Sequence, residues 1–123
     1  MSNDELGLFI ENNRTAFTPG SALELSVLWA LPAKPDSLEV RLFWYTRGKG
    51  TEDIKVIATE KIPVTTAAGE AKIRFTLPAA PWSFSGRLIS LLWAAELIAE
   101  PGTRSARCEF LLSPTGKEIL LHA

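Results

Sequence analysis

The sequence predicts an all-β protein, an antiparallel β-sandwich of about 7–8 strands. Apolar and polar residues alternate with a period of two over successive stretches, which is typical of half-buried strands. Turn signals that contain Gly or Pro separate these stretches at intervals of about 8–14 residues. No long window shows the three- and four-residue spacing of an amphipathic helix. Short antiparallel strands then favour a sandwich over a βαβ fold. A short closed barrel is the alternative, because small barrels show the same alternation.

The expected strands follow one another along the chain and leave no room for a helix. They lie near residues 6–11, 22–31, 37–46, 53–64, 70–77, 87–99, 104–113 and 117–121. Four of them show the alternation clearly, and their apolar faces carry Leu23, Leu25, Val27 and Trp29, then Leu38, Val40, Leu42 and Trp44, then Ala71, Ile73, Phe75 and Leu77, then Ala106, Cys108, Phe110 and Leu112. Trp29, Trp44 and Trp93 fall on apolar faces, so we expect them in the core rather than around a ligand.

Length and charge limit the classes of function. A chain of 123 residues has the size of one domain, 1–123. The formal net charge of −1 gives no basic surface for nucleic acid or an anionic membrane. One cysteine and a polar N-terminus without a signal-peptide pattern suit a cytoplasmic protein. The longest uncharged apolar run is too short for membrane insertion.

The sequence contains few residues that are suited to catalysis. The single histidine, His122, stands at the C-terminus, where a positioned base is not expected. Cys108 falls on an apolar strand face and reads as a core residue rather than a nucleophile. Glu96 and Glu100 are interpreted as solvated charges rather than a glycosidase pair. We expect no enzyme activity, no catalytic residue, no metal site and no cofactor.

The segment 87–99 is apolar on both faces, whereas a sandwich strand normally keeps one face in water. One interpretation is that its own chain covers the outer face. The other is an exposed patch that docks a protein partner or a second copy. Candidate residues for that surface are Leu88, Leu92 and Ile98 from this segment and Phe43 and Tyr45 from a neighbouring strand. Trp82 is a sixth candidate, because it stands in a Pro-rich connection and either covers one end of the core or lies exposed.

Two motifs resemble the arrestin-like domain family. The first, "FTPGSALELSVLWAL", is similar to the Pro-Gly hairpin and strand that open such domains. The second, "IRFTLPAAPWSFSGRLISLLWAAEL", is similar to a later signature of a Leu-Pro strand end, a Pro-x-Ser-Phe-x-Gly connection and a long strand. The matching residues, over about 17–98, are Pro19, Gly20, Leu77, Pro78, Pro81, Ser83, Phe84, Gly86, Ile89, Ser90 and Trp93. Arrestins have two sandwiches and this chain has length for one. The resemblance therefore implies a single-domain, half-arrestin adaptor without the phosphate-sensing residues of receptor-binding arrestins.

We therefore predict a non-catalytic protein-interaction module, an adaptor or assembly subunit, with an arrestin-like or immunoglobulin-like sandwich. Its strand edges, with residues 7–11 and 118–122 as the terminal candidates, are expected to pair with a partner protein or within a homo-oligomer. The alternative is a small-ligand or carbohydrate-binding module that uses Trp82 and neighbouring loops. The sequence does not identify the partner.

Overall fold

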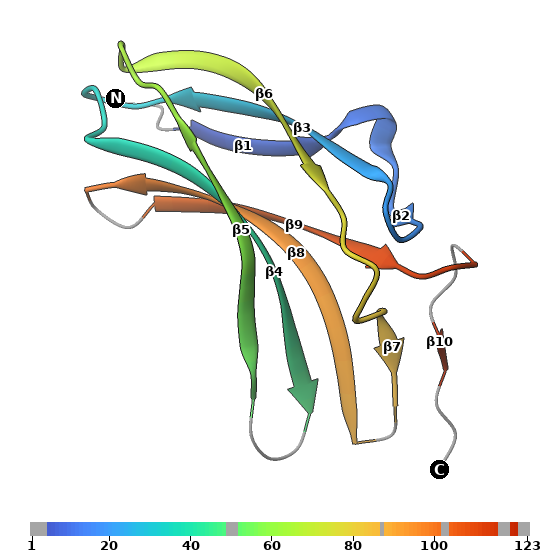
Figure 1. Cartoon of the computed structure of the whole chain (residues 1–123). Helices are drawn as coiled ribbons and strands as arrows, with labels where there is room; N and C mark the ends of the chain where they lie inside the picture. Colours follow the sequence, from blue (N-terminus) through green and yellow to red (C-terminus); the bar gives the residue numbers. More distant parts are fainter. Residues whose placement is uncertain (1–4, 49–51, 87, 102–103, 116–118, 121–123) are drawn as a thin grey trace.

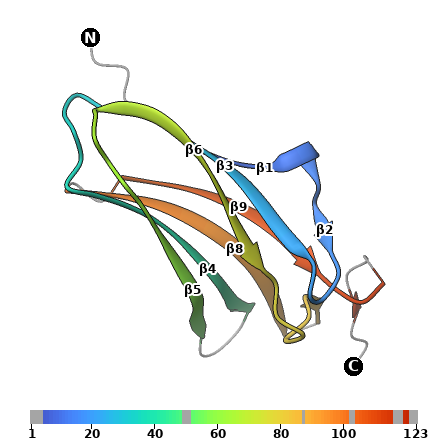
Figure 2. The same cartoon turned by 45° about the horizontal axis from the view of Figure 1, so that its top comes forward.

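Two β-sheets face each other in a computed structural model that describes residues 5–48, 52–86, 88–101, 104–115 and 119–120 (Figures 1 and 2). The smaller sheet has the order β1-β3-β6, with bounds β1 Glu5–Ile10, β3 Ala22–Ala30 and β6 Ala68–Thr76. The larger sheet has the order β10-β7-β8-β4-β5, with bounds β10 Ile119–Leu120, β7 Phe84–Ser85, β8 Ile89–Glu100, β4 Ser37–Gly48 and β5 Ile54–Ile62. Strand β9, Arg104–Leu112, pairs with β8 on one side and with β2, Ala16–Phe17, on the other. The predicted all-β sandwich is confirmed.

The eight predicted strands are present with ends shifted by a few residues, and three short elements were missed. Strands β2 and β7 are two residues long, so they leave no alternation to detect. A 3-10 turn, η1, spans Glu11–Asn13. Most pairings are antiparallel, but β2 runs parallel to β9 and β10 runs parallel to β7. Of the strand predicted at 117–121, only Ile119 and Leu120 are among the described residues, and they pair with β7 of the same chain.

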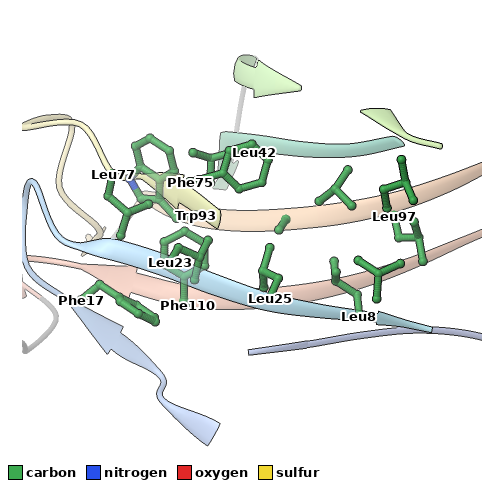
Figure 3. Packing of buried hydrophobic residues seen from close by; sticks show 14 of the residues in the cluster. Leu8, Phe17, Leu23, Leu25, Leu42, Phe75, Leu77, Trp93, Leu97 and Phe110 are labelled. Atoms are coloured by element: carbon green, nitrogen blue, oxygen red, sulfur yellow. The ribbon is translucent and has the colours of Figure 1, made fainter. Parts of the chain in front are cut away.

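The hydrophobic core fills the space between the sheets (Figure 3). Leu23 and Leu25 of β3 face Leu42 of β4 and Leu97 of β8, as their alternation predicts. Trp93 is fully buried at the centre of β8. Trp29 is also buried, whereas Trp44 is only half-buried although it packs against the same core. Trp44 belongs to the C-terminal half of β4, and the C-terminal end of this strand runs past the smaller sheet in Figure 1.

The two family-like motifs meet in space. Gly20 of the first donates its N–H to the carbonyl of Leu77 in the second over 3.0 Å, and Leu77 donates to the carbonyl of Ser21 over 2.9 Å. Gly20 has φ +80°, a left-handed conformation that glycine adopts without strain. The Pro-Gly turn before β3 is therefore fixed to the Leu-Pro end of β6, which extends their pairing by one step.

Hydrogen bonds with Trp93 and Leu112 hold the Pro-rich connection after β6 in place. The indole N–H of Trp93 donates to the carbonyl of Pro81 over 2.8 Å. Ser83 is fully buried, and its hydroxyl accepts the N–H of Leu112 over 2.9 Å. Ser83 in turn donates its own N–H to the carbonyl of Leu112 over 2.7 Å. Phe84 then packs against the core. This segment joins the end of β6 to the C-terminal end of β9.

The N-terminal segment crosses from one sheet to the other. Strand β1 pairs with β3, the chain turns at η1, and β2 pairs with β9. Asn12 and Asn13 make this corner with φ of 61° and 53°, a conformation that asparagine tolerates better than most residues. Backbone N–H groups of Leu111 and Ser113 donate to the carbonyls of Thr15 and Phe17 over 2.8 and 3.0 Å.

Candidate functional site

The outer face of the larger sheet contains most of the predicted interaction residues. Tyr45 and Phe43 of β4 lie opposite Leu92 and Ala94 of β8 on this face. Phe43 was expected to be exposed, and this expectation is wrong, since only 2% of its surface is accessible. Ala94 is fully buried, and Tyr45, Leu92 and Ile98 are half-buried. This face therefore offers less apolar surface than the sequence suggests.

The side chain of Arg107 in β9 covers the aromatic rings on this face of the sheet. Its guanidinium carbon lies 5.1 Å from the ring centre of Phe43 and 5.5 Å from that of Tyr45. Both distances lie within the range of cation–π attraction. Arg107 is held in place by Glu96 of β8, with 3.7 Å between the guanidinium nitrogen and the carboxylate oxygen. The stem and head of this arginine shield the two rings from water.

A network of polar side chains covers the same face around Tyr45. The Tyr45 hydroxyl donates to the carboxylate of Glu109 and accepts an N–H of Arg47 over 3.2 Å. Arg47 also lies 3.7 Å from Glu109, and the hydrogen bond to Tyr45 raises the pKa of Arg47 above its ordinary value. Of the two interpretations of segment 87–99, the structure favours the one in which the chain covers its own strand. We call this region, Phe43, Tyr45, Arg107 and Glu109 with the strand beneath them, the covered face.

Strand β5 differs, because its large apolar side chains are open to water. Ile54 is 65% exposed, Val56 47% and Ile57 38%. Within the described residues β5 pairs with β4 alone and stands at the end of the sheet order. We call Ile54, Val56 and Ile57 the open edge. This strand was predicted from the sequence, but its exposure was not. The signal for exposure was a run of β-branched residues in a strand that lacks clear alternation.

A β-bulge in this pairing sets which way the edge residues point. Ala58 lies opposite Leu42 and Val56 opposite Phe43, so Ile57 is the extra residue. Ile54 and Val56 thus share the outer face with Tyr45 and Phe43. Lys55, opposite Trp44, shares the inner face.

The remaining predicted site residues do not form one cluster. Leu88 is 67% exposed, and its carbonyl lies so close to Gly48 that a Cβ on Gly48 would sit 1.9 Å away. Leu88 is therefore at the same end of β4 as Tyr45. Ile98 lies opposite Glu39, farther along the sheet. Trp82 is 42% exposed in the connection after β6, where its indole N–H donates to the carbonyl of Ala79 over 2.8 Å.

The described residues offer no group of three or more His, Cys, Asp or Glu side chains that would hold a metal ion. The Cα atoms of Glu96 and Glu100, four positions apart on one strand, lie about 13 Å from each other at ordinary strand rise, and the Glu96 carboxylate is paired with Arg107. Burial raises the pKa of the Cys108 thiol to about 11. His122 lies outside the described residues. No helix in the described part of the chain is long and apolar enough to span a membrane.

The outer face of the smaller sheet carries a second apolar spot. Phe9 of β1 and Leu28 of β3 are exposed there, beside an open hollow of about 500 Å³. Glu70 and Lys72 of β6 also line the hollow. Phe9 folds back along its strand over Gly7, whose missing side chain leaves space for the ring.

Comparison with known proteins identifies solved structures with a similar fold but no family to which the chain belongs. No protein-family model and no curated protein sequence matches this chain. Among solved structures, the sporulation control protein Spo0M from Bacillus subtilis superposes with a TM-score of 0.69 at 15% sequence identity. The match covers 92% of this chain and 50% of that one, so this chain spans about half of the Spo0M chain. At this identity the likeness shows the β-sandwich fold.

A β-glucosidase from Listeria innocua also matches, in structures with laminaribiose and with isofagomine. The TM-score is 0.46 in both, with 16% and 15% identity, over 98% of this chain and 17% of the enzyme chain. So weak a superposition on so small a part of an enzyme carries no argument about activity.

Proposed function

We propose that this protein is a non-catalytic interaction module, an adaptor or assembly subunit, that binds an extended segment of a partner protein along β5. The observation that carries the proposal is the open edge, where Ile54, Val56 and Ile57 stand on a strand that has a single neighbour among the described residues. We further propose that the module is one domain, 1–123, of the arrestin-like kind, and that it works in the cytoplasm.

The physical basis is strand addition. An edge strand presents unpaired backbone N–H and C=O groups, to which an extended peptide adds as a new strand. Backbone hydrogen bonds then provide affinity, and side-chain contacts on the two faces provide specificity. On the outer face the added strand would contact Ile54 and Val56. Tyr45 and Leu92 continue this surface toward the sheet centre, since Tyr45 lies between Ile54 and Leu92.

The arrestin-like assignment is supported by the way in which the two motifs pack. The Pro-Gly turn and the Leu-Pro strand end hydrogen-bond to each other, and the Pro-x-Ser-Phe-x-Gly connection is fixed by Trp93 and Ser83. These contacts give five of the motif residues a structural role in the sandwich, namely Gly20, Leu77, Pro81, Ser83 and Trp93. Spo0M, which shares the fold, is a sporulation control protein, and this supports a regulatory rather than a catalytic role for the present chain.

Trp82 supports the second candidate, a small-ligand or carbohydrate-binding module. Its ring is partly exposed, and the hydrogen bond to Ala79 fixes the ring orientation. Such a site would use the ring as an apolar platform. Trp82→Ala would then abolish glycan or small-ligand binding in a glycan-array or calorimetric assay and leave folding intact.

The main proposal is tested by affinity capture from the native cell followed by mass spectrometry. The bait is compared with an Ile54→Ser/Val56→Ser variant. A Phe9→Ser variant serves as the control, because it removes an exposed apolar side chain from the other sheet. We expect a partner that is retained by wild type and by the control and lost by the edge variant. An identical set of captured proteins for all three baits contradicts the proposal.

A further inference from the structure

We propose that the partner strand at the open edge is β5 of a second copy of this chain, paired antiparallel about a two-fold axis. The inference rests on the proposed function, because it names the occupant of the same edge. The continuous sheet would then pass from β4 and β5 of one copy to β5 and β4 of the other. Each copy would present the same surface to its partner, as an isologous dimer requires.

The two faces of β5 limit which residues can lie opposite each other across the two-fold axis. A two-fold axis perpendicular to a sheet keeps every side chain on its own face, so two residues face each other only if both point the same way. Lys55 lies opposite Trp44 and Glu60 lies opposite Val40, so both point to the inner face. In a regular strand two residues five positions apart point to opposite faces. The bulge at Ile57 adds one residue and puts them on the same face.

The charges then select one register. When Lys55 of one copy faces Glu60 of the other, the symmetry creates the same pair a second time. Both side chains are exposed in the single chain. Opposite charges directly across two strands stabilise the pairing, and like charges destabilise it.

In the neighbouring registers Lys55 no longer lies opposite Glu60 of the second copy. A shift that places Ala58 opposite Lys55 also places Asp53 opposite Glu60, two like charges. A shift in the other direction places Ile62 opposite Lys55 and leaves both charges without an opposite partner. The sequence of β5 therefore fits one two-fold register better than those on either side.

The same register covers the open edge on the outer face. Val56 would face Thr59 of the second copy, and Ile54 would face Lys61, whose aliphatic stem lies over apolar neighbours when its ammonium group stays in water. Thr59 and Lys61 point outward, since they lie opposite Arg41 and Glu39. A bulge and an inward-pointing lysine usually protect an edge strand from pairing with other chains. In β5 the same two features would make the edge specific for a second copy of this chain.

The test is a charge exchange measured by sedimentation velocity and light scattering over a dilution series. Wild type is expected to form a reversible dimer. Lys55→Glu alone and Glu60→Lys alone each place like charges across both symmetric pairs, and each should weaken the dimer roughly tenfold or more. The combined Lys55→Glu/Glu60→Lys variant restores both pairs with their signs exchanged, so its dimer should return to near wild-type affinity.

Glu70→Lys is the matched control, because it makes the same charge change as Glu60→Lys on β6, an exposed strand of the other sheet. It should leave the dimer unchanged. Thermal unfolding of each variant verifies that the fold is intact. A wild-type protein that stays monomeric at every concentration overturns the inference, as does a combined variant as weak as the single ones. In either case, loss of a captured partner from the Ile54→Ser/Val56→Ser bait would still support the proposed function.

Discussion

The covered face and the open edge both contain large apolar residues, but these residues are shielded in the first and exposed in the second. Both place large apolar side chains on the outer side of the same sheet. Strand β8 lies between β4 and β9, which supply Tyr45, Arg47, Arg107 and Glu109 to close the surface above it. Strand β5 has one neighbour among the described residues and receives no such cover. Whether an apolar strand face is exposed thus depends on the side chains that its neighbours provide, and not on its own composition.

The largest expected difference between the two regions is in stability. Phe43→Ala removes a buried ring from the covered face and should lower the free energy of unfolding by at least about 3 kcal/mol. Val56→Ala, one strand away on the same face, removes a largely exposed side chain and should cost less than about 1 kcal/mol. Denaturant unfolding monitored by tryptophan fluorescence measures both. Equal losses would show that the two regions do not differ in burial.

A smaller effect is expected from removing the cover itself. Arg107→Ala exposes the rings of Phe43 and Tyr45 and removes the cation–π contacts and the ion pair with Glu96. The loss should be about 1 kcal/mol, together with increased binding of an apolar fluorescent dye. Arg74→Ala, an exposed arginine of the smaller sheet, is the control and should change neither quantity. Unchanged dye binding by Arg107→Ala would argue against the arginine as the cover.

The smallest effect at neutral pH concerns Cys108, which faces inward from β9 beneath the covered face. Its pKa of about 11 lies above the ordinary value of 9.0 because burial disfavours the thiolate. The thiol of the unfolded chain ionises first as the pH rises. The stability contribution of this group is therefore complete below pH 9 and is lost as the pH rises from about 9 to 11. Cys108→Ala should flatten the pH dependence of stability in that interval, and thiol reagents should label native Cys108 more slowly than the denatured chain at pH 8.

Alternation together with the turn signals was enough to predict an all-β fold and to favour a sandwich, because the core strands keep one apolar face over most of their length. It could not reveal β2 and β7, whose two residues contain no period. The correct face was predicted for Phe43 but not its burial, because the covering arginine is more than sixty residues away in the sequence. The exposure of β5 was missed for a related reason. Strand order, which determines which strand lacks a neighbour, is not encoded in any one segment.

The crossing of the N-terminal segment between the sheets has a mechanical consequence. Strand β2 belongs near the start of the chain and β9 near its end, and the two run parallel. If the ends are pulled apart, force acts on β2 toward its start and on β9 toward its finish. The hydrogen bonds from Leu111 and Ser113 are then loaded together in shear instead of being broken one at a time. After β1 has been peeled from β3 and β10 has left β7, the parallel pair of β2 and β9 would be the point at which the sandwich resists extension.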